Sequence, residues 1–349
     1  MRTHSKAFLV LLSGAMSVSV ATAPAFAGSD APVLGADPEI VTHSAATTGS
    51  DRAAEYWTPE RMAAAIPVDV TLDAPADTDG ASEVTVGTPG RAAPAAPLDR
   101  SVDLDGARTD DIETGSIATK WSGPRKSPPA STSGRVFFVA DDGGSYSCSG
   151  STVNSDGKNV VFTAGHCVHG GGAGRAWFDA ALWIFAPSYN EKKKNVTPFG
   201  WWTASQLWSL SGWVDSADRT FDIGAVVMQT DAAGTHIVDA VGGQGIEWNW
   251  PLVQDIYQFG YPANAPFQGK KLQYCSGFTY DDGGHVGINC NMTEGASGGP
   301  WLDDFDGTFG WLDSVNSWVF WDGAGVRYKW NGPYFGDAAA DLYAAVEFL

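Results

Sequence analysis

A chain of 349 residues is long enough for one large domain or two ordinary ones, once any N-terminal targeting segment has been removed. Its formal net charge of −19 argues against nucleic acid or an anionic membrane surface as a partner, because both would repel an acidic protein. The acidity itself mainly indicates solubility.

The N-terminus has the pattern of a secretory signal peptide. Arg2 and Lys6 precede an apolar run over residues 7–20, and small residues follow at Ala25 and Ala27. We expect cleavage after Ala27, which makes residues 1–27 the signal peptide. The apolar run is shorter than the roughly 18 residues of a membrane anchor. The protein is therefore expected to be secreted, extracellular and free of the membrane, with its four cysteines in two disulfides.

Residues 28–130 are rich in Ala, Pro, Thr and Asp, with only Tyr56, Trp57 and Trp121 as aromatics. Such a segment buries little apolar surface, so we expect it to be poorly structured. Within it, Thr58 is placed to cap a short helix that starts at Pro59. Two interpretations stay open: a linker with a helical turn, or a pro-segment that docks on the mature domain.

From about Ser131 the sequence changes to short β-rich runs, at 134–140, 159–165, 221–228 and 255–261, separated by Gly, Asn and Asp. Repeated short strands with turn signals indicate an all-β sandwich or barrel. No nucleotide-binding glycine motif and no repeat of fixed period is present. The last run, 335–349, is expected to be a helix with Asp337 as its cap.

Ser297 lies in the run Gly-Ala-Ser-Gly-Gly-Pro, residues 295–300. Its glycines allow backbone conformations in which the amides of Gly295 and Ser297 point to one place. Two such donors beside a hydroxyl would form an oxyanion hole next to a nucleophile. The alternative is an ordinary glycine-rich turn of a β protein.

A serine nucleophile needs a base, and histidine is the usual one because its pKa lies near neutrality. His166 follows the strand-like run 159–164, at a strand end where barrel loops expose side chains. A metal site with His169 is disfavoured, because no further ligands occur at a fixed spacing.

The base in turn needs a carboxylate that orients its ring. Asp222 heads the apolar strand 223–228, where its side chain would be carried toward the interior and would need a partner. Asp215 and Asp218 lie in a more polar stretch and are expected at the surface.

The motifs TAGHC at His166, DIGAVV at Asp222 and GASGGP at Ser297, in this chain order, resemble the chymotrypsin-like (trypsin-like) serine peptidases of the secreted bacterial type. α/β-Hydrolases and subtilisins carry their triads in other orders. The resemblance covers roughly residues 131–349. It implies two packed antiparallel β-barrels with the triad in the cleft between them, closed by a C-terminal helix.

The resemblance also implies a disulfide between Cys148 and Cys167. With that pairing accepted, Cys275 and Cys290 would form the second disulfide and brace the loop that leads to the nucleophile.

Three residues near Ser297 limit what the resemblance implies. Ala296 stands where many animal members have the Asp that pairs with the new N-terminus after activation, so that switch is expected to be absent. Asn291 stands at the base of the specificity pocket where trypsins have Asp, so a preference for basic substrate residues is not supported. Glu294 would disfavour acidic substrates if it faced the cleft, which leaves glutamyl specificity open.

The sequence therefore predicts a secreted serine endopeptidase, made as a zymogen with a propeptide, that acts through an acyl-enzyme. His166, Asp222 and Ser297 would be catalytic, and Gly295 and Ser297 would form the oxyanion hole. No cofactor or metal is required, the partner is a peptide or protein substrate, and we expect a monomer. Two alternatives remain: a catalytically silent fold that binds glycans or the cell wall through its 15 tryptophans, and an esterase with the same triad.

Overall fold

The β-rich runs of the sequence form strands in the computed structural model, which describes residues 38–45, 49–68, 84–99, 115–321 and 327–349. The expected signal peptide lies outside the described residues. All described residues belong to one unit, Asp37–Leu349. Within the described residues, no helix is both long and apolar enough to span a membrane.

The elements are short, as the spacing of turn residues predicts. The strands are β1 (Ile40–Ser44), β2 (Ile66–Pro67), β3 (Gly90–Ala92), β4 (Thr119–Lys120), β5 (Ser133–Val139), β6 (Ser145–Val153), β7 (Val160–Thr163), β8 (Ile184–Pro187), β9 (Trp202–Leu210), β10 (Gly224–Met228), β11 (Gly245–Trp248), β12 (Asp255–Gly260), β13 (Gln273–Phe278), β14 (Tyr280–Asp281), β15 (Val286–Asn289), β16 (Pro300–Asp303), β17 (Trp311–Val315), β18 (Trp318–Trp321) and β19 (Arg327–Gly332). The helices are α1 (Gly49–Tyr56), α2 (Pro59–Ala64), α3 (Ser211–Ser216), α4 (Ile237–Val241) and α5 (Asp337–Val346).

Six strands close the first barrel. They run in the order β5, β6, β7, β10, β9 and β8, and β8 pairs again with β5, with every pairing antiparallel. Closure leaves no free edge within this ring. Its strands carry many fully buried side chains, among them Phe137, Phe162, Ile184 and Leu207.

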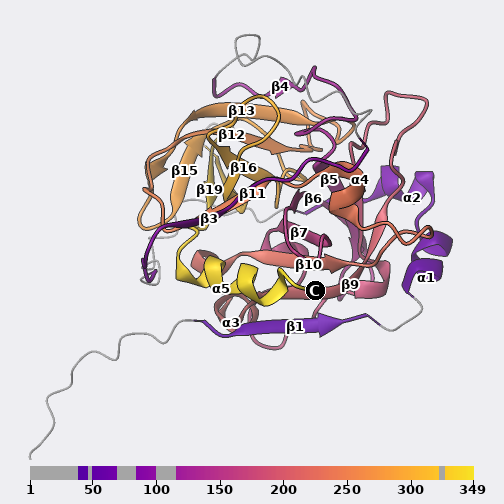
Figure 1. The fold of residues 1–349 in the computed structure, drawn as a ribbon, viewed down its shortest axis with the longest axis horizontal. Coiled ribbons are helices and arrows are strands. Elements are labelled where there is room, and N and C mark those ends of the chain that lie inside the picture. The colour runs from indigo at the N-terminus through magenta and orange to yellow at the C-terminus, as the bar shows by residue number, and fades with distance from the viewer. Residues whose placement is uncertain (1–37, 46–48, 69–83, 100–114, 322–326) are drawn as a thin grey trace, which may run out of the picture. The chain divides into compact units, whose positions relative to one another are not determined.

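The second barrel is built from two sheets. One has the order β3, β11, β17, β16, β12, β13 and β4, and the other has the order β14, β15, β19 and β18. A separate apolar core contains Ile256, Ile288, Trp301 and Trp330. In Figure 1 most of these strands form the orange part of the molecule, with β3 and β4 in indigo to purple, while the first barrel is magenta to pink. The expectation of an all-β fold with two barrels and a C-terminal helix is confirmed.

The C-terminal helix α5 packs against β9, β10 and β11 (Figure 1). The expected cap is displaced by one residue. Gly336 occupies the N-cap position and provides no side-chain hydrogen bond, whereas Asp337 is the first helical residue. The Asp337 carboxylate accepts instead from Asn249 Nδ2, at 2.6 Å, so a tertiary partner holds the group that was expected to cap the helix.

The described parts of the N-terminal segment form the short helices α1 and α2 and four short strands. Its four strands pair with barrel strands: β1 with β9, β2 with β6, β3 with β11 and β4 with β13. Thr58 caps α2 as expected, accepting from the Arg61 amide. Next to it, buried Trp57 packs on Phe137 of β5 and donates to Leu182 O at 2.7 Å. Of the two interpretations, docking on the barrels agrees with these contacts.

One edge of the second barrel carries a buried acidic group. Glu247 on β11 is fully buried, and burial with the nearby Asp303 carboxylate raises the pKa of Glu247 to about 7, against the opposing effect of Arg91. Burial, with Glu247 as a second cause, also raises the pKa of Asp313 well above its ordinary value. These carboxyls hold protons more tightly in the folded protein than in the unfolded chain.

Replacing Glu247 by glutamine is therefore expected to flatten the pH dependence of stability. The contribution of Glu247 to the free energy of unfolding is complete below about pH 4.5 and is lost as the pH rises through about 7, a change on the order of 3 kcal/mol. Urea unfolding between pH 4 and 8 measures it. The exposed Glu55→Gln change is the control and should keep the parent's slope. An unchanged slope in Glu247→Gln would contradict the assignment.

Candidate active site

His166 lies at the end of a strand of the first barrel. It is the central residue of the 3-10 turn Gly165–Cys167, which follows β7, and it is only 5% exposed. Its ring Nδ1 lies 2.7 Å from Oδ2 of Asp222, and its backbone N–H donates to Oδ1 of the same carboxylate at 2.7 Å. Both the ring and the backbone of His166 are thus held by one acidic side chain.

Asp222 is carried into the interior just before β10 and is 1% exposed. Besides the two contacts with His166, it accepts a hydrogen bond from the Ser317 hydroxyl. An ionised carboxylate can only accept, so a neutral His166 carries its proton on Nδ1 and leaves Nε2 as an acceptor. Asp215 is exposed, as expected, and Asp218 caps the turn Arg219–Phe221 through the Thr220 amide.

The other ring nitrogen of His166 has an unused lone pair. Nε2 is buried and has no hydrogen-bond partner within the described residues, Ser297 included. A buried acceptor without a partner is unfavourable, and such groups concentrate where a ligand or reacting atom completes the site. Serine–histidine contacts are also often longer in a free enzyme than in its complex with substrate.

Ser297 lies in the loop between β15 and β16 of the second barrel and is 2% exposed. Its carbonyl accepts from the Ser149 amide of β6, at 2.7 Å. The next residue, Gly298, has φ +77°, and a Cβ there would lie 2.0 Å from Thr163 Oγ1 and 2.9 Å from the Ala164 amide. Only glycine permits this approach. The loop with Ser297 is therefore pressed against the strand end that leads into His166.

The backbone before Ser297 also has a glycine-only conformation. Gly295 has φ +91°, and a Cβ there would lie 2.9 Å from Tyr261 O. Its carbonyl accepts from Ser149 Oγ at 2.8 Å, while the amides of Gly295 and Ser297 donate to no acceptor within the described residues. Two free backbone donors in one turn can receive an anionic oxygen.

Asn291 forms hydrogen bonds with the stretch of chain that precedes the first barrel. Its Oδ1 accepts from the Ala118 amide at 2.7 Å, and its own amide donates to Ser116 O. Its place at the base of a specificity pocket stays a prediction. Glu294 is buried and accepts from Asn264 Nδ2 at 2.8 Å, and its effect on acidic substrates stays a prediction.

Both expected disulfides are present, Cys148–Cys167 and Cys275–Cys290. The first joins β6 to the turn that carries His166. Within the described residues, Cys148, His166 and Cys167 form the one group of side chains close enough together to be considered as metal ligands. The two sulfurs are bonded to each other, so they do not offer thiolates, and the donor set does not fit a metal.

The described tryptophan side chains are buried or half-buried, and none is exposed. Trp183, Trp301 and Trp330 are among the largest fully buried side chains. This agrees with hydrophobic packing and gives no support to a glycan-binding face on those side chains.

Ser317 is a site residue that the sequence analysis missed. It lies between β17 and β18, and it is buried with its hydroxyl on Asp222. The sequence offers only a serine just before a strand that begins with an aromatic residue, and this pattern is too common to identify a functional residue. Its position suggests that it keeps the Asp222 carboxylate facing His166.

Replacing Ser317 by alanine is expected to lower kcat about tenfold with KM nearly unchanged, because one hydrogen bond to a buried charge is lost. Steady-state kinetics with a peptide substrate measure this, together with the pH profile of kcat/KM, whose midpoint should move as Asp222 loses a donor. Ser317→Thr keeps a hydroxyl and should recover most of the rate. An unaltered pH profile in Ser317→Ala would argue against a positioning role.

The two-barrel fold is shared with solved proteases, and this similarity supports a peptidase. Among solved structures, the chain is similar to the protease Anisep from Arthrobacter nicotinovorans, with 32% identity, a TM-score of 0.58, and coverage of 66% of this chain and 99% of that chain. It is also similar to the thermostable serine protease AL20 from an extremophilic microorganism, with 33% identity, a TM-score of 0.57, and coverage of 62% of this chain and 97% of that one. The chain belongs to the chymotrypsin-like serine peptidase family, as its motifs predict.

A curated relative shares a shorter segment. An extracellular metalloprotease of Bacillus subtilis (strain 168) is 33% identical over 122 residues, which are 35% of this chain and 35% of that protein. The match thus spans about a third of the length of that relative. No family model matches the chain.

Proposed function

We propose that the protein is a secreted serine endopeptidase that hydrolyses peptide bonds through an acyl-enzyme. The observation that carries the proposal is the state of the His166 ring, which has Asp222 at Nδ1 and an unpartnered, buried Nε2. A general base needs one nitrogen held by an orienting group and the other free to take a proton. Ser297, in the loop pressed against that strand end, is the hydroxyl assigned as nucleophile.

In the first half of the reaction, Ser297 Oγ attacks the carbonyl carbon of the scissile bond while Nε2 of His166 takes the hydroxyl proton. The carbonyl oxygen becomes an anion, which the amides of Gly295 and Ser297 receive. Asp222 stabilises the imidazolium that has formed. His166 then gives the proton to the leaving amine, and an ester of Ser297 remains.

In the second half, water repeats the attack with His166 again as base and acid, which releases the acid product and restores the Ser297 hydroxyl. Every proton in this cycle passes through Nε2, and no cofactor enters it.

For substrate choice, Asn291 is proposed as the pocket residue that replaces a carboxylate. An amide does not neutralise a desolvated lysine or arginine side chain, so a preference for basic residues before the cut is not expected. Asn291 forms hydrogen bonds with residues 116–118, so that stretch of chain would lie beside the proposed pocket.

Export and processing form the other part of the proposal. The apolar N-terminus with Ala25 and Ala27 supports a signal peptide, and two disulfides suit an oxidising compartment. We propose that cleavage between the N-terminal segment and the barrels removes latency. N-terminal sequencing of the exported protein, with peptide hydrolysis before and after processing, measures both events.

The direct test uses a fluorophosphonate probe and a mixed peptide library on the exported protein. The proposal expects a covalent adduct on Ser297, mapped by mass spectrometry, and cleavage of internal peptide bonds. Hydrolysis of esters without hydrolysis of peptides would favour an esterase. A protein that neither reacts with the probe nor cuts any substrate would overturn the proposal.

A further inference from the structure

Arg91, in the N-terminal segment, is held by a set of side chains on the second barrel. Its Nη2 donates to Glu247 Oε2 at 2.6 Å and lies 3.9 Å from Asp303, and its Nη1 lies 3.3 Å from Asp304. The guanidinium carbon also lies 4.1 Å from the ring centre of Trp250 and 4.5 Å from that of Trp311. We call Glu247, Asp303, Asp304, Trp250 and Trp311 the Arg91 cage.

This cage suits a guanidinium better than other cations. Two indole faces stack on a flat, weakly hydrated ion, and carboxylates meet both of its terminal nitrogens. An ammonium group is compact and strongly hydrated, so it would use the charges but not both stacking faces. The Arg91 side chain is 28% exposed, whereas Glu247 is fully buried.

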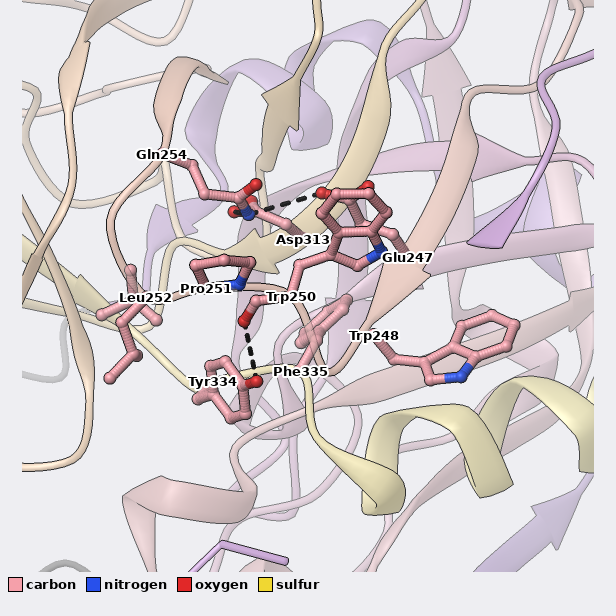
Figure 2. A pocket seen from close by; sticks show the side chains of 10 residues that line it. Glu247, Trp248, Trp250, Pro251, Leu252, Gln254, Asp313, Tyr334 and Phe335 are labelled. Carbon is pink, nitrogen blue, oxygen red and sulfur yellow. Dashed lines mark hydrogen bonds between the residues drawn. The ribbon is translucent and has the colours of Figure 1, made fainter. Parts of the chain in front are cut away.

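The barrel orients the cage independently of Arg91. Gln254 Nε2 donates to Asp313 Oδ2 at 2.9 Å and lies 3.4 Å from Glu247 Oε1, which leaves Glu247 Oε2 for Arg91. Figure 2 shows Gln254 reaching toward the carboxylates of Asp313 and Glu247, with the Trp250 ring beside them and Tyr334 below. The cavity that they line is about 10 Å³, room for little more than one water molecule.

Removal of Arg91 would leave this region without a cation. Within the described residues, Arg91 is the one basic side chain paired with Glu247, Asp303 or Asp304, and Asp313 Oδ1 has no partner there. Removing one member of a buried ion pair leaves the other either charged without a partner or forced to take up a proton, and both cost free energy. The folded barrels are therefore more stable with Arg91 bound than without it.

The chain on both sides of Arg91 is also bound along its length. β3 pairs with β11 in the register Arg91 to Glu247, Thr88 O accepts from Asn249 Nδ2, and Ala95 exchanges two backbone hydrogen bonds with Gly243. β3 thereby covers the β11 edge, which would otherwise be open.

We propose that the Arg91 cage is a binding site for an arginine-bearing strand, and that it keeps residues 84–99 attached to the barrels as a separate bound chain after the precursor is cut. The inference rests on the proposed processing but not on chemistry at Ser297. The bound partner is an extended strand that carries one guanidinium group. The binding site is the edge strand β11, flanked by carboxylates and indoles.

The test uses the full chain with Ser297→Ala, which prevents self-digestion. Two recognition sequences for a site-specific endopeptidase are inserted, one between residues 68 and 84 and the other between residues 99 and 115. After complete cutting, gel filtration at neutral pH followed by mass spectrometry measures how long the Arg91 fragment stays bound. We expect it to co-elute with the barrels, and Arg91→Met to speed its release at least about tenfold. Arg91→Lys should lie between the two.

Leu98→Ala is the matched control, because it shortens an apolar side chain of the same fragment at a position that is 70% exposed. It should leave the release rate within about twofold of the parent, as surface changes usually do. Loss of the parent fragment during filtration, or equal retention of Arg91→Met and the parent, would overturn the proposal.

A second measurement covers the case in which cutting unfolds the protein. Amide hydrogen exchange on the uncut chain should be at least about tenfold faster at β3 and β11 in Arg91→Met than in the parent or Leu98→Ala. Equal exchange in all three would reject the cage as the anchor. Fluorophosphonate labelling of the unmodified protein reports separately on Ser297, so failure of one proposal is distinguishable from failure of the other.

Discussion

Replacing Ser297 by alanine is expected to lower kcat for peptide hydrolysis by a factor on the order of 10⁶. The methyl group has no lone pair to attack a carbonyl, so no acyl-enzyme forms. The amides of Gly295 and Ser297 remain, and they leave a residual rate above that of water. KM should change little, because the removed oxygen contributes little to binding of the ground state.

The measurement is a progress curve at high enzyme concentration, with fluorophosphonate labelling as a second readout. Ser216→Ala, at the exposed end of α3, is the control for a lost hydroxyl and should keep the parent's rate and labelling. Urea unfolding verifies that each variant is folded. Undiminished labelling in Ser297→Ala would assign the nucleophile to another residue.

Replacing Asp222 by asparagine is expected to lower kcat by a factor on the order of 10⁴ at neutral pH. The carboxylate now accepts from the His166 ring, the His166 amide and the Ser317 hydroxyl. An amide has one oxygen in place of two, and its NH₂ group facing Nδ1 favours the ring form that carries its proton on Nε2. That form cannot take a proton from Ser297.

This prediction is checked by kcat/KM from pH 6 to 10, with Asp215→Asn as the control because Asp215 is exposed. The loss should shrink at high pH, where hydroxide replaces part of the general-base function. A decrease below tenfold at neutral pH would show that Asp222 does not orient His166.

Several features of the site were accessible from the sequence because they depend on local chemistry. The glycines around Ser297 predicted a backbone that only glycine allows, and Gly295 and Gly298 both have positive φ. The strand before His166 and the apolar strand after Asp222 were predicted from β-branched runs, and both are central barrel strands. Turn residues and strand propensity act over a few residues, so a linear sequence records them.

The contacts of the N-terminal segment could not be predicted from such local patterns. Its composition predicted that it could not build a core, and its described strands indeed pair with the barrels. Composition could not reveal that Trp57 would fill a space on Phe137, or that Arg91 would stand opposite Glu247. Those contacts join residues more than 75 positions apart, and nothing near either residue in the sequence indicates its partner.

The sequence alone determined the strand-rich character of residues 131–349 and the family, and it supplied the predicted order and identity of the reactive groups, because each depends on residue type and short-range spacing. The tertiary structure decided which groups share an environment: the Ser317 hydroxyl on Asp222, the unpartnered Nε2 of His166, the engagement of Asn291 by Ala118, and the Arg91 cage. Burial and hydrogen-bond partners depend on how distant strands pack, and that packing exists only once both barrels have closed.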